Sequence, residues 1–163
     1  MDKQQIGIIG KHILIANLFA ASLEVAEPIR DHGIDLIVYR DGMSGGKFIC
    51  RPIQLKTATD EAFELYSKYE RFPDLRMIYV WKTRDPQYAE FYCLTYPEAI
   101  SVLKSLKHAG YSILKEKGHW VTTKPSEALK KILKENFQVK EPKDWHERLR
   151  MKESNSTSPN AKR

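Results

Sequence analysis

Cysteine is scarce in this chain of 163 residues, which has two, and none of its apolar runs is long enough to span a bilayer. Both cysteines, Cys50 and Cys93, lie in strand-like apolar stretches without the spacing of metal ligands. We therefore expect small buried thiols in a reducing compartment rather than a disulfide framework. The N-terminus also lacks the basic, apolar and small-residue regions of a signal peptide. These absences predict a cytoplasmic protein without a membrane partner.

Acidic residues are in the minority: Asp and Glu total 21 against 27 for Lys and Arg, which gives a net charge of +6 at pH 7. A basic balance permits binding to a polyanion, but many basic surfaces are merely solvated, so charge alone identifies no partner. Hydrophobic residues make up 42% and charged residues 29%, as is ordinary for a soluble globular domain. No repeat of solenoid period is present, and the length suits one domain with a core of its own.

The first half of the chain predicts a helix followed by three strands. Apolar residues recur at helical spacing over residues 5–23, and a short strand is expected at 23–26. Strands at 35–39 and 47–57 flank residues 40–46, whose Asp-Gly and Gly-Gly pairs are typical of a hairpin turn. Pro52 lacks a backbone N–H, so it predicts an edge or a bulge in the second of these strands.

The second half alternates strands and helices. Thr59 resembles a helix cap, and aromatic residues at 63, 66 and 69 have helical spacing, so a helix is predicted there. Strands are expected at 75–81 and 90–94, a helix from Thr95 to about 106, a short strand at 110–114, and a helix after residues 123–127. The order α-β-β-β-α-β-β-α-(β)-α predicts an α/β (α+β) fold in which helices flank a mixed β-sheet.

The last part of the chain differs in composition. We predict one domain over residues 1–138 and a charged C-terminal extension over 139–163, which is disordered towards its end because 154–163 lacks large apolar residues. The pairs His119-Trp120 and Trp145-His146 have no metal-ligand spacing, so both tryptophans are predicted to pack in the core or at the domain edge.

The hairpin contains the clearest functional signal. Side chains alternate faces along a strand, so Gln54 and Lys56 emerge on one face and Leu55 on the other. Asp35 opens the partner strand. If Asp35 pairs near Gln54, a carboxylate, an amide and an ammonium meet at one end of a sheet, where packing gives no reason for them.

At these residues the chain resembles the PD-(D/E)XK nuclease superfamily, in the branch with a Gly-Ile-Asp strand start, here residues 33–35, and a Gln-x-Lys-Thr strand, here 54–57. The likeness covers roughly residues 7–106. It implies a restriction-endonuclease-like core that hydrolyses phosphodiester bonds of DNA with a divalent cation. Asp35 then matches the first acid, Gln54 stands where the second acid usually does, and Lys56 matches the catalytic lysine.

The resemblance also implies a set of metal ligands. Mg²⁺ or Mn²⁺ would be held by the Asp35 carboxylate, the Leu55 carbonyl and the Gln54 amide oxygen, because hard cations take oxygen ligands. Lys56 would orient a water molecule or help to deprotonate it. Gln54 brings one negative charge fewer than the usual acid.

The family's helical glutamate is missing, since Lys11 and His12 follow Gly10 where it is expected. Lys11 cannot ligate a metal, and His12 suits metals softer than Mg²⁺. Glu27 is the best substitute acid because it ends the strand beside the Asp35 strand. Glu24 and Asp31 remain alternatives.

Basic residues flank the motif in sequence, and we expect them to contact nucleic acid around the same cleft: Lys11, Arg30, Arg40 and Lys47. The alternative to a nuclease is a catalytically inactive nucleic-acid-binding module of the same fold. A third possibility is an interaction protein in which the match is accidental. Asp35 would then be an ordinary strand-end acid and Gln54 a polar strand residue. Lys56 would be a charged residue that prevents a strand edge from pairing with another chain.

Overall fold

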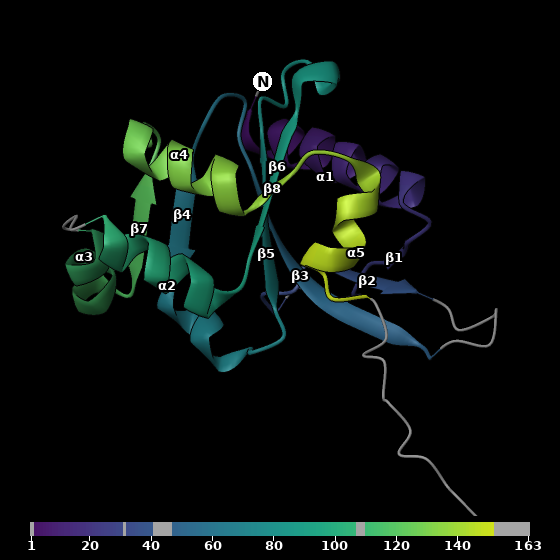
Figure 1. Cartoon of the computed structure of the whole chain (residues 1–163), viewed down its shortest axis with the longest axis horizontal. Helices are drawn as coiled ribbons and strands as arrows, with labels where there is room; N and C mark the ends of the chain where they lie inside the picture. The colour runs from purple at the N-terminus through teal and green to yellow at the C-terminus, as the bar shows by residue number, and fades with distance from the viewer. Residues whose placement is uncertain (1, 31, 41–46, 107–109, 152–163) are drawn as a thin grey trace, which may run out of the picture.

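The computed structural model describes residues 2–30, 32–40, 47–106 and 110–151, which form a central six-stranded sheet (Figure 1). All neighbouring strands are antiparallel except β3 and β5, which are parallel. The predicted mixed sheet flanked by helices is therefore confirmed. The strands, in their order across the sheet, are β1 Glu24–Ala26, β2 Leu36–Arg40, β3 Ile49–Thr57, β5 Arg76–Trp81, β6 Glu90–Leu94 and β8 Gln138–Val139.

Helices cover both faces of this sheet. Helix α1 Lys3–Ala20 and the short α5 Trp145–Arg148 lie on one face, as Figure 1 shows. The other face is covered by α2 Tyr96–Ser105, α3 Gly110–Lys117, α4 Glu127–Asn136 and a small antiparallel sheet of β4 Phe63–Tyr66 and β7 His119–Thr122. Alternate residues of β5 supply the two cores, Tyr79 and Trp81 on the side of the small sheet and Ile78 and Val80 on the side of α1.

Helix α1 packs closely on the end of β3. It begins at Lys3, because Asp2 accepts a hydrogen bond from the Gln5 backbone in a capping box. Gly10 is buried, and a Cβ at this position would overlap the side chain of Thr57. This glycine, which weakens the helical pattern in the sequence, permits the close approach of helix and strand.

Two predicted elements are wrong. Residues 63–66 form β4, followed by a 3₁₀ helix over Ser67–Arg71, in place of the predicted helix. The decisive pattern has period two: Phe63 and Leu65 are fully buried, while Glu64 and Tyr66 face outward. Residues 110–114 belong to α3 instead of a strand, and Gly110 packs against the Trp120 ring.

The region around Pro52 is regular. The β2–β3 ladder runs without a bulge through the pair Ile37 and Pro52. Strand β5 joins β3 only from the pair Ile53 and Arg76 onward. Pro52 therefore occupies the half of β3 that β5 does not pair with, which agrees with the predicted edge and not with the predicted bulge.

The chain after residue 138 packs on the fold as far as Met151. Trp145, Leu149 and Met151 are fully buried, and the Trp145 indole donates to the Asn17 side chain at 2.6 Å. The predicted packing role of Trp145 is confirmed, and so is that of Trp120, which is 7% exposed. The predicted disorder at the end of the chain lies outside the described residues. Within those residues, no helix has the length and apolar character needed to cross a membrane.

Candidate functional site

The structure brings Asp35 and Gln54 into contact at one end of the β2–β3 ladder. The Asp35 backbone N–H donates to the Ile53 carbonyl at 2.8 Å, which extends the ladder by one residue. The Asp35 Oδ2 accepts two hydrogen bonds, from the Gln54 amide at 2.5 Å and from the Leu55 backbone N–H at 2.6 Å. Gln54 is only 7% exposed, so this contact lies in a largely dry setting. The amide nitrogen of Gln54, and not its oxygen, faces the carboxylate.

Lys56 lies on the same face of β3 as Gln54, two residues further on, and has its own partner. Its Nζ is 3.0 Å from Glu64 Oε1, and the Lys56 side chain is 16% exposed. Burial disfavours the charged ammonium, but the Glu64 carboxylate and the Tyr69 hydroxyl outweigh it, so the pKa of Lys56 is raised above its ordinary value. Lys56 is therefore a cation at neutral pH and not a base.

Glu64 is the site residue that sequence reasoning missed. It lies on β4, within the segment that was predicted to be a helix, so its face could not be assigned. Its backbone carbonyl accepts a hydrogen bond from the buried Tyr79 hydroxyl at 2.7 Å, which fixes the strand beside Lys56. Tyr69 connects the two pairs: burial raises its pKa, Lys56 lowers it, and both Glu64 and Asp35 raise it. The net pKa is raised, so Tyr69 stays neutral at physiological pH.

A cavity of about 480 Å³ opens between α1 and this end of the sheet, and Asp35, Leu55 and Glu27 all line it. Glu27 follows the last β1–β2 pair and so lies at the Asp35 end, as predicted for a substitute acid. Its carboxylate is 2.8 Å from Lys11 Nζ, which lines the same cavity. Within the described parts of the chain, no three His, Cys, Asp or Glu side chains lie close enough to hold a metal ion together.

Two further candidate ligands, His12 and Glu24, do not line this cavity. His12 bonds to the Ile8 carbonyl at 2.8 Å and lines a separate cavity with Asn17 and Gln138, so it cannot share a metal with Asp35. Glu24 pairs with Tyr39, towards the far end of the hairpin. Asp31 lies outside the described residues.

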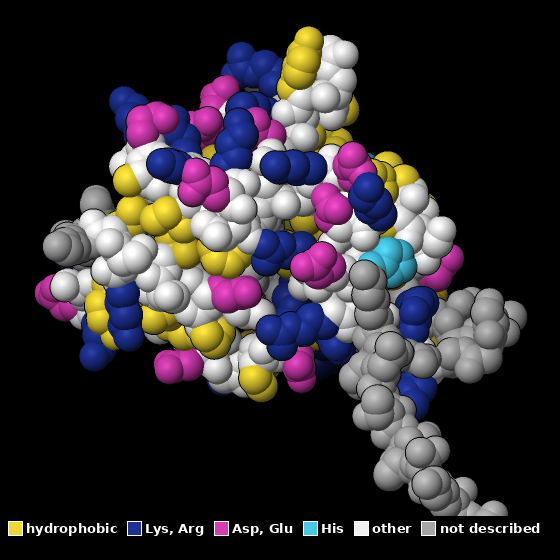
Figure 2. Space-filling model, in the orientation of Figure 1, with side chains coloured by type: hydrophobic (Ala, Val, Ile, Leu, Met, Phe, Trp, Pro, Cys, Tyr) yellow, Lys and Arg dark blue, Asp and Glu magenta, His cyan; other side chains and the backbone are white. Residues whose placement is uncertain are grey.

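The four predicted nucleic-acid-binding residues do not surround one cleft. Lys11 lines the Asp35 cavity, and Arg30 is exposed next to its wall. Arg40 pairs with Ile49, at the opposite end of the hairpin from Asp35, and Lys47 lies just beyond. Five residues of strand separate Arg40 from Asp35, a distance of roughly 17 Å. Lys and Arg side chains alternate with acidic ones over the face in Figure 2, with one basic gathering below its centre.

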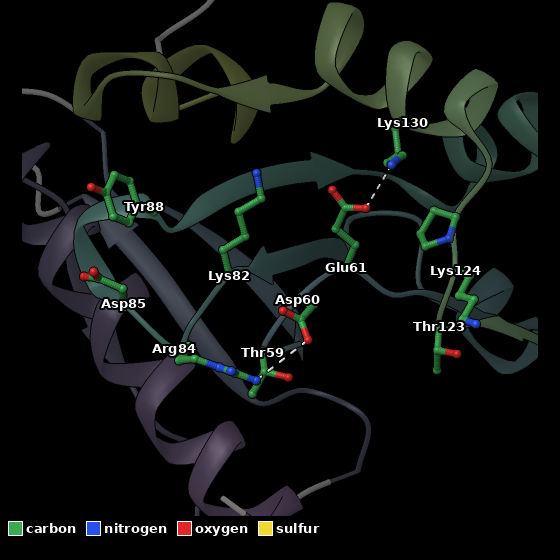
Figure 3. Close-up of a pocket in the computed structure, with 11 residues that line it drawn as sticks. Thr59, Asp60, Glu61, Lys82, Arg84, Asp85, Tyr88, Thr123, Lys124 and Lys130 are labelled. Carbon is green, nitrogen blue, oxygen red and sulfur yellow. Dashed lines mark ion pairs between the residues drawn. The ribbon is translucent and has the colours of Figure 1, made fainter.

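A further cavity, of about 690 Å³, lies outside the carboxyl ends of β3 and β5 (Figure 3). Figure 3 shows Lys130 reaching from α4 toward Glu61, and Arg84 toward Asp60; the ion-pair distances are 3.1 Å and 4.0 Å. Such places at the ends of parallel strands commonly bind ligands in α/β proteins. Its cations alternate with acids, so it has no strong charge of one sign.

Lys82, on the rim of this cavity, is paired with the start of β6. Its Nζ lies 2.7 Å from Glu90 Oε1, and the Tyr92 hydroxyl donates to the same carboxylate at 2.7 Å. Burial disfavours the Glu90 anion, but these two partners outweigh it and lower the pKa of Glu90 below its ordinary value. The pair thus ties β6 to the end of β5.

No protein-family model, curated protein or solved structure matches this chain.

Proposed function

We propose that this chain is a metal-dependent nuclease-like protein of the PD-(D/E)XK superfamily, with a restriction-endonuclease-like core, that acts on or binds DNA. One observation supports it above the others: Asp35 lies directly opposite Gln54 at a sheet end, with Lys56 on the same strand face. These three residue types in this order along two paired strands resemble the branch of that superfamily in which a glutamine stands where the second acid usually does. A cavity beside Asp35 provides room for a phosphate group.

The residues at this end of the sheet fit a hard divalent cation in their chemistry. The Asp35 carboxylate, the Leu55 carbonyl and the Glu27 carboxylate are oxygen donors of the kind that Mg²⁺ and Mn²⁺ take, and all three residues line one cavity. Gln54 would join them after its amide turns its oxygen toward Asp35. A bound cation would neutralise phosphate charge and activate water. Lys56 does not line this cavity; it lines a neighbouring hollow, and Thr57 lines both. Held as an ammonium, Lys56 would stabilise negative charge on a phosphate that reaches from the cavity towards that hollow.

A second function, a non-catalytic nucleic-acid-binding module, is favoured by a different observation. Each charged group of the site already has a protein partner: Asp35 accepts from Gln54 and Leu55, Glu27 pairs with Lys11, and Lys56 pairs with Glu64. A metal ion must compete with these contacts, which lowers its affinity. The same fold would then bind nucleic acid without cleaving it.

The test is nicking of supercoiled and linear DNA with Mg²⁺ or Mn²⁺ by the wild type, Asp35→Ala and Lys56→Ala. Both substitutions should abolish cleavage, and Mn²⁺ should support more activity than Mg²⁺, because Mg²⁺ demands near-ideal octahedral oxygen coordination. Asp74→Ala and Lys131→Ala, which change exposed residues outside both cavities, should cleave like the wild type.

The outcomes separate the candidates. Equal cleavage by the wild type and both site variants would mean that another site or a contaminant is responsible. No cleavage by any variant, together with DNA binding that weakens steeply with salt, would favour the binding module, because phosphate contacts release counterions. Absence of both cleavage and DNA binding would favour the third possibility, an interaction protein in which the sequence match is accidental.

A further inference from the structure

The outer face of the small sheet carries an aromatic pair next to Lys56. Tyr66 of β4 lies opposite His119 of β7, and their rings stack with centroids 5.8 Å apart and planes 21° from parallel. Phe63, Leu65 and Trp120 point the other way, into the core. His119 is exposed, whereas Tyr66 is partly buried and stacks against one face of the His119 ring.

Two lysines approach this pair. Lys56 Nζ is 5.0 Å and Lys68 Nζ 5.5 Å from the centroid of the Tyr66 ring, and the Tyr69 ring meets Tyr66 edge-on at 5.9 Å. Packing of a cross-strand pair accounts for the stacking of the two rings. The ion pair with Glu64 accounts for the position of Lys56. Neither contact accounts for the exposed Lys68 beside the same ring.

A hollow of about 410 Å³ continues from this pair along the same face. Lys56, Glu64 and Val121 line it, and Val121 is 46% exposed there although it is a large apolar residue. Thr59, Asp60, Glu61 and Thr123 line both this hollow and the cavity of Figure 3, so the two adjoin. The volume lies in the range of about 300–1,000 Å³ typical of sites that enclose one small ligand.

We propose that His119, stacked on Tyr66, is a shelf for a nucleobase of single-stranded DNA, with the adjoining phosphates at Lys56 and Lys68. This rests on the proposed function and names its substrate class. An aromatic shelf needs a base with an open face, which duplex DNA does not offer because its bases are stacked on one another. Lys56 lines the hollow, so the sugar-phosphate backbone of a bound strand would pass beside the lysine of the proposed site.

The test compares three fluorescent probes by anisotropy: a single-stranded oligonucleotide, the same strand with abasic sites at its centre, and the duplex. His119→Ala should weaken binding of the intact single strand about 5- to 150-fold, the equivalent of one lost base stack of about 1–3 kcal/mol. Binding of the abasic strand and the duplex should change less than twofold. His119→Phe keeps an aromatic face and should restore the affinity.

His12→Ala is the matched control. His12 is also an exposed histidine with one ring nitrogen bonded to a backbone carbonyl, and it lies in a separate cavity. His12→Ala should leave the affinities for all three probes unchanged.

A uniform loss on all three probes after His119→Ala, or no loss on the intact strand, would overturn the shelf while leaving the proposed function in place. If the wild type binds none of the probes, the proposed function fails and the shelf with it.

Discussion

Gln54→Glu puts a second carboxyl group against Asp35. In the wild type the Gln54 amide nitrogen donates to Asp35 Oδ2 at 2.5 Å, and the Gln54 side chain is almost fully buried. The substitution keeps the shape of the side chain, but it exchanges an attractive donor for a like charge in the same place. Above the pKa values of both groups, two anions would face each other at hydrogen-bond distance.

The cost follows from this geometry. Two unit charges 4 Å apart interact by about 4 kcal/mol at an effective dielectric constant near 20. Loss of the hydrogen bond to a carboxylate adds about 1.5–3 kcal/mol. The introduced carboxyl group avoids part of this repulsion by taking up a proton, which costs about 1.4 kcal/mol for each unit by which the pH exceeds its unfolded-state pKa. We therefore expect the free energy of unfolding at pH 7 to fall by about 3–4 kcal/mol.

The stability of Gln54→Glu should fall as the pH rises. The pair raises the folded-state pKa of one carboxyl above its unfolded value of about 4.3. The variant is therefore most stable below that unfolded value, where the protonated carboxyl donates to Asp35, and it loses stability as the pH rises through the folded pKa. Gln54→Met removes the hydrogen bond without adding charge, so its loss should be independent of pH.

Urea unfolding of both variants at pH 4.5 and pH 7, with and without Mn²⁺, measures the loss of stability, its pH dependence and the effect of the metal. A metal that binds between Asp35 and the new carboxyl should restore stability to Gln54→Glu at pH 7 and leave Gln54→Met unchanged, because a ligand of the native state stabilises it by mass action. If Gln54→Glu loses the same free energy at both pH values, the carboxyl groups do not face each other and the geometric reasoning is refuted.

Three further predictions concern the fold. Gly10→Ala should lower the free energy of unfolding by about 1–3 kcal/mol, because the new methyl group overlaps Thr57 of β3. Gly7→Ala on the same helix meets nothing within 4 Å and should raise the free energy of unfolding by about 0.5–1 kcal/mol. Thermal unfolding of both variants measures the contrast. Glu90→Gln should lower the free energy of unfolding by roughly 1 kcal/mol at pH 7. The loss should shrink as the pH falls through the lowered folded-state pKa of Glu90, and acid titrations of the two proteins test this. A thiol reagent should label Cys50 and leave Cys93 unlabelled in the native protein, because Cys50 is exposed while burial raises the pKa of Cys93 to about 12. Labelling of both cysteines at equal rates would contradict the structure.

The central sheet could be predicted because its signals are local. The strand at 90–94 was predicted with its observed bounds. Strands β2 and β3 are antiparallel neighbours, and the sequence between them is typical of hairpins. Pairing across a hairpin follows from its alternation and length, so the meeting of Asp35 and Gln54 could be anticipated before any long-range contact was known.

Residues 63–71 could not be predicted in the same way. Their aromatic residues fit the spacing of a helix and, in part, that of a strand. The strand is selected by its partner, since β4 pairs with β7 from more than fifty residues away in the chain. Local propensity carries no information about such a partner, and α3, which packs beside β7, was missed for the same reason.

The chemical role of Lys56 depends on that distant pairing. From the sequence, Lys56 could serve either as a base or as a charged group, because the environment that decides its protonation is unknown. The structure places Glu64 and Tyr69 beside it, and their effect on its pKa exceeds that of burial. A lysine whose pKa is raised holds its proton throughout the neutral range, so in the proposed nuclease it would act on a phosphate through its charge and its hydrogen bonds. In the proposed nuclease, deprotonation of the attacking water would then depend on the Asp35 side of the site, where Asp35, Leu55 and Glu27 line one cavity.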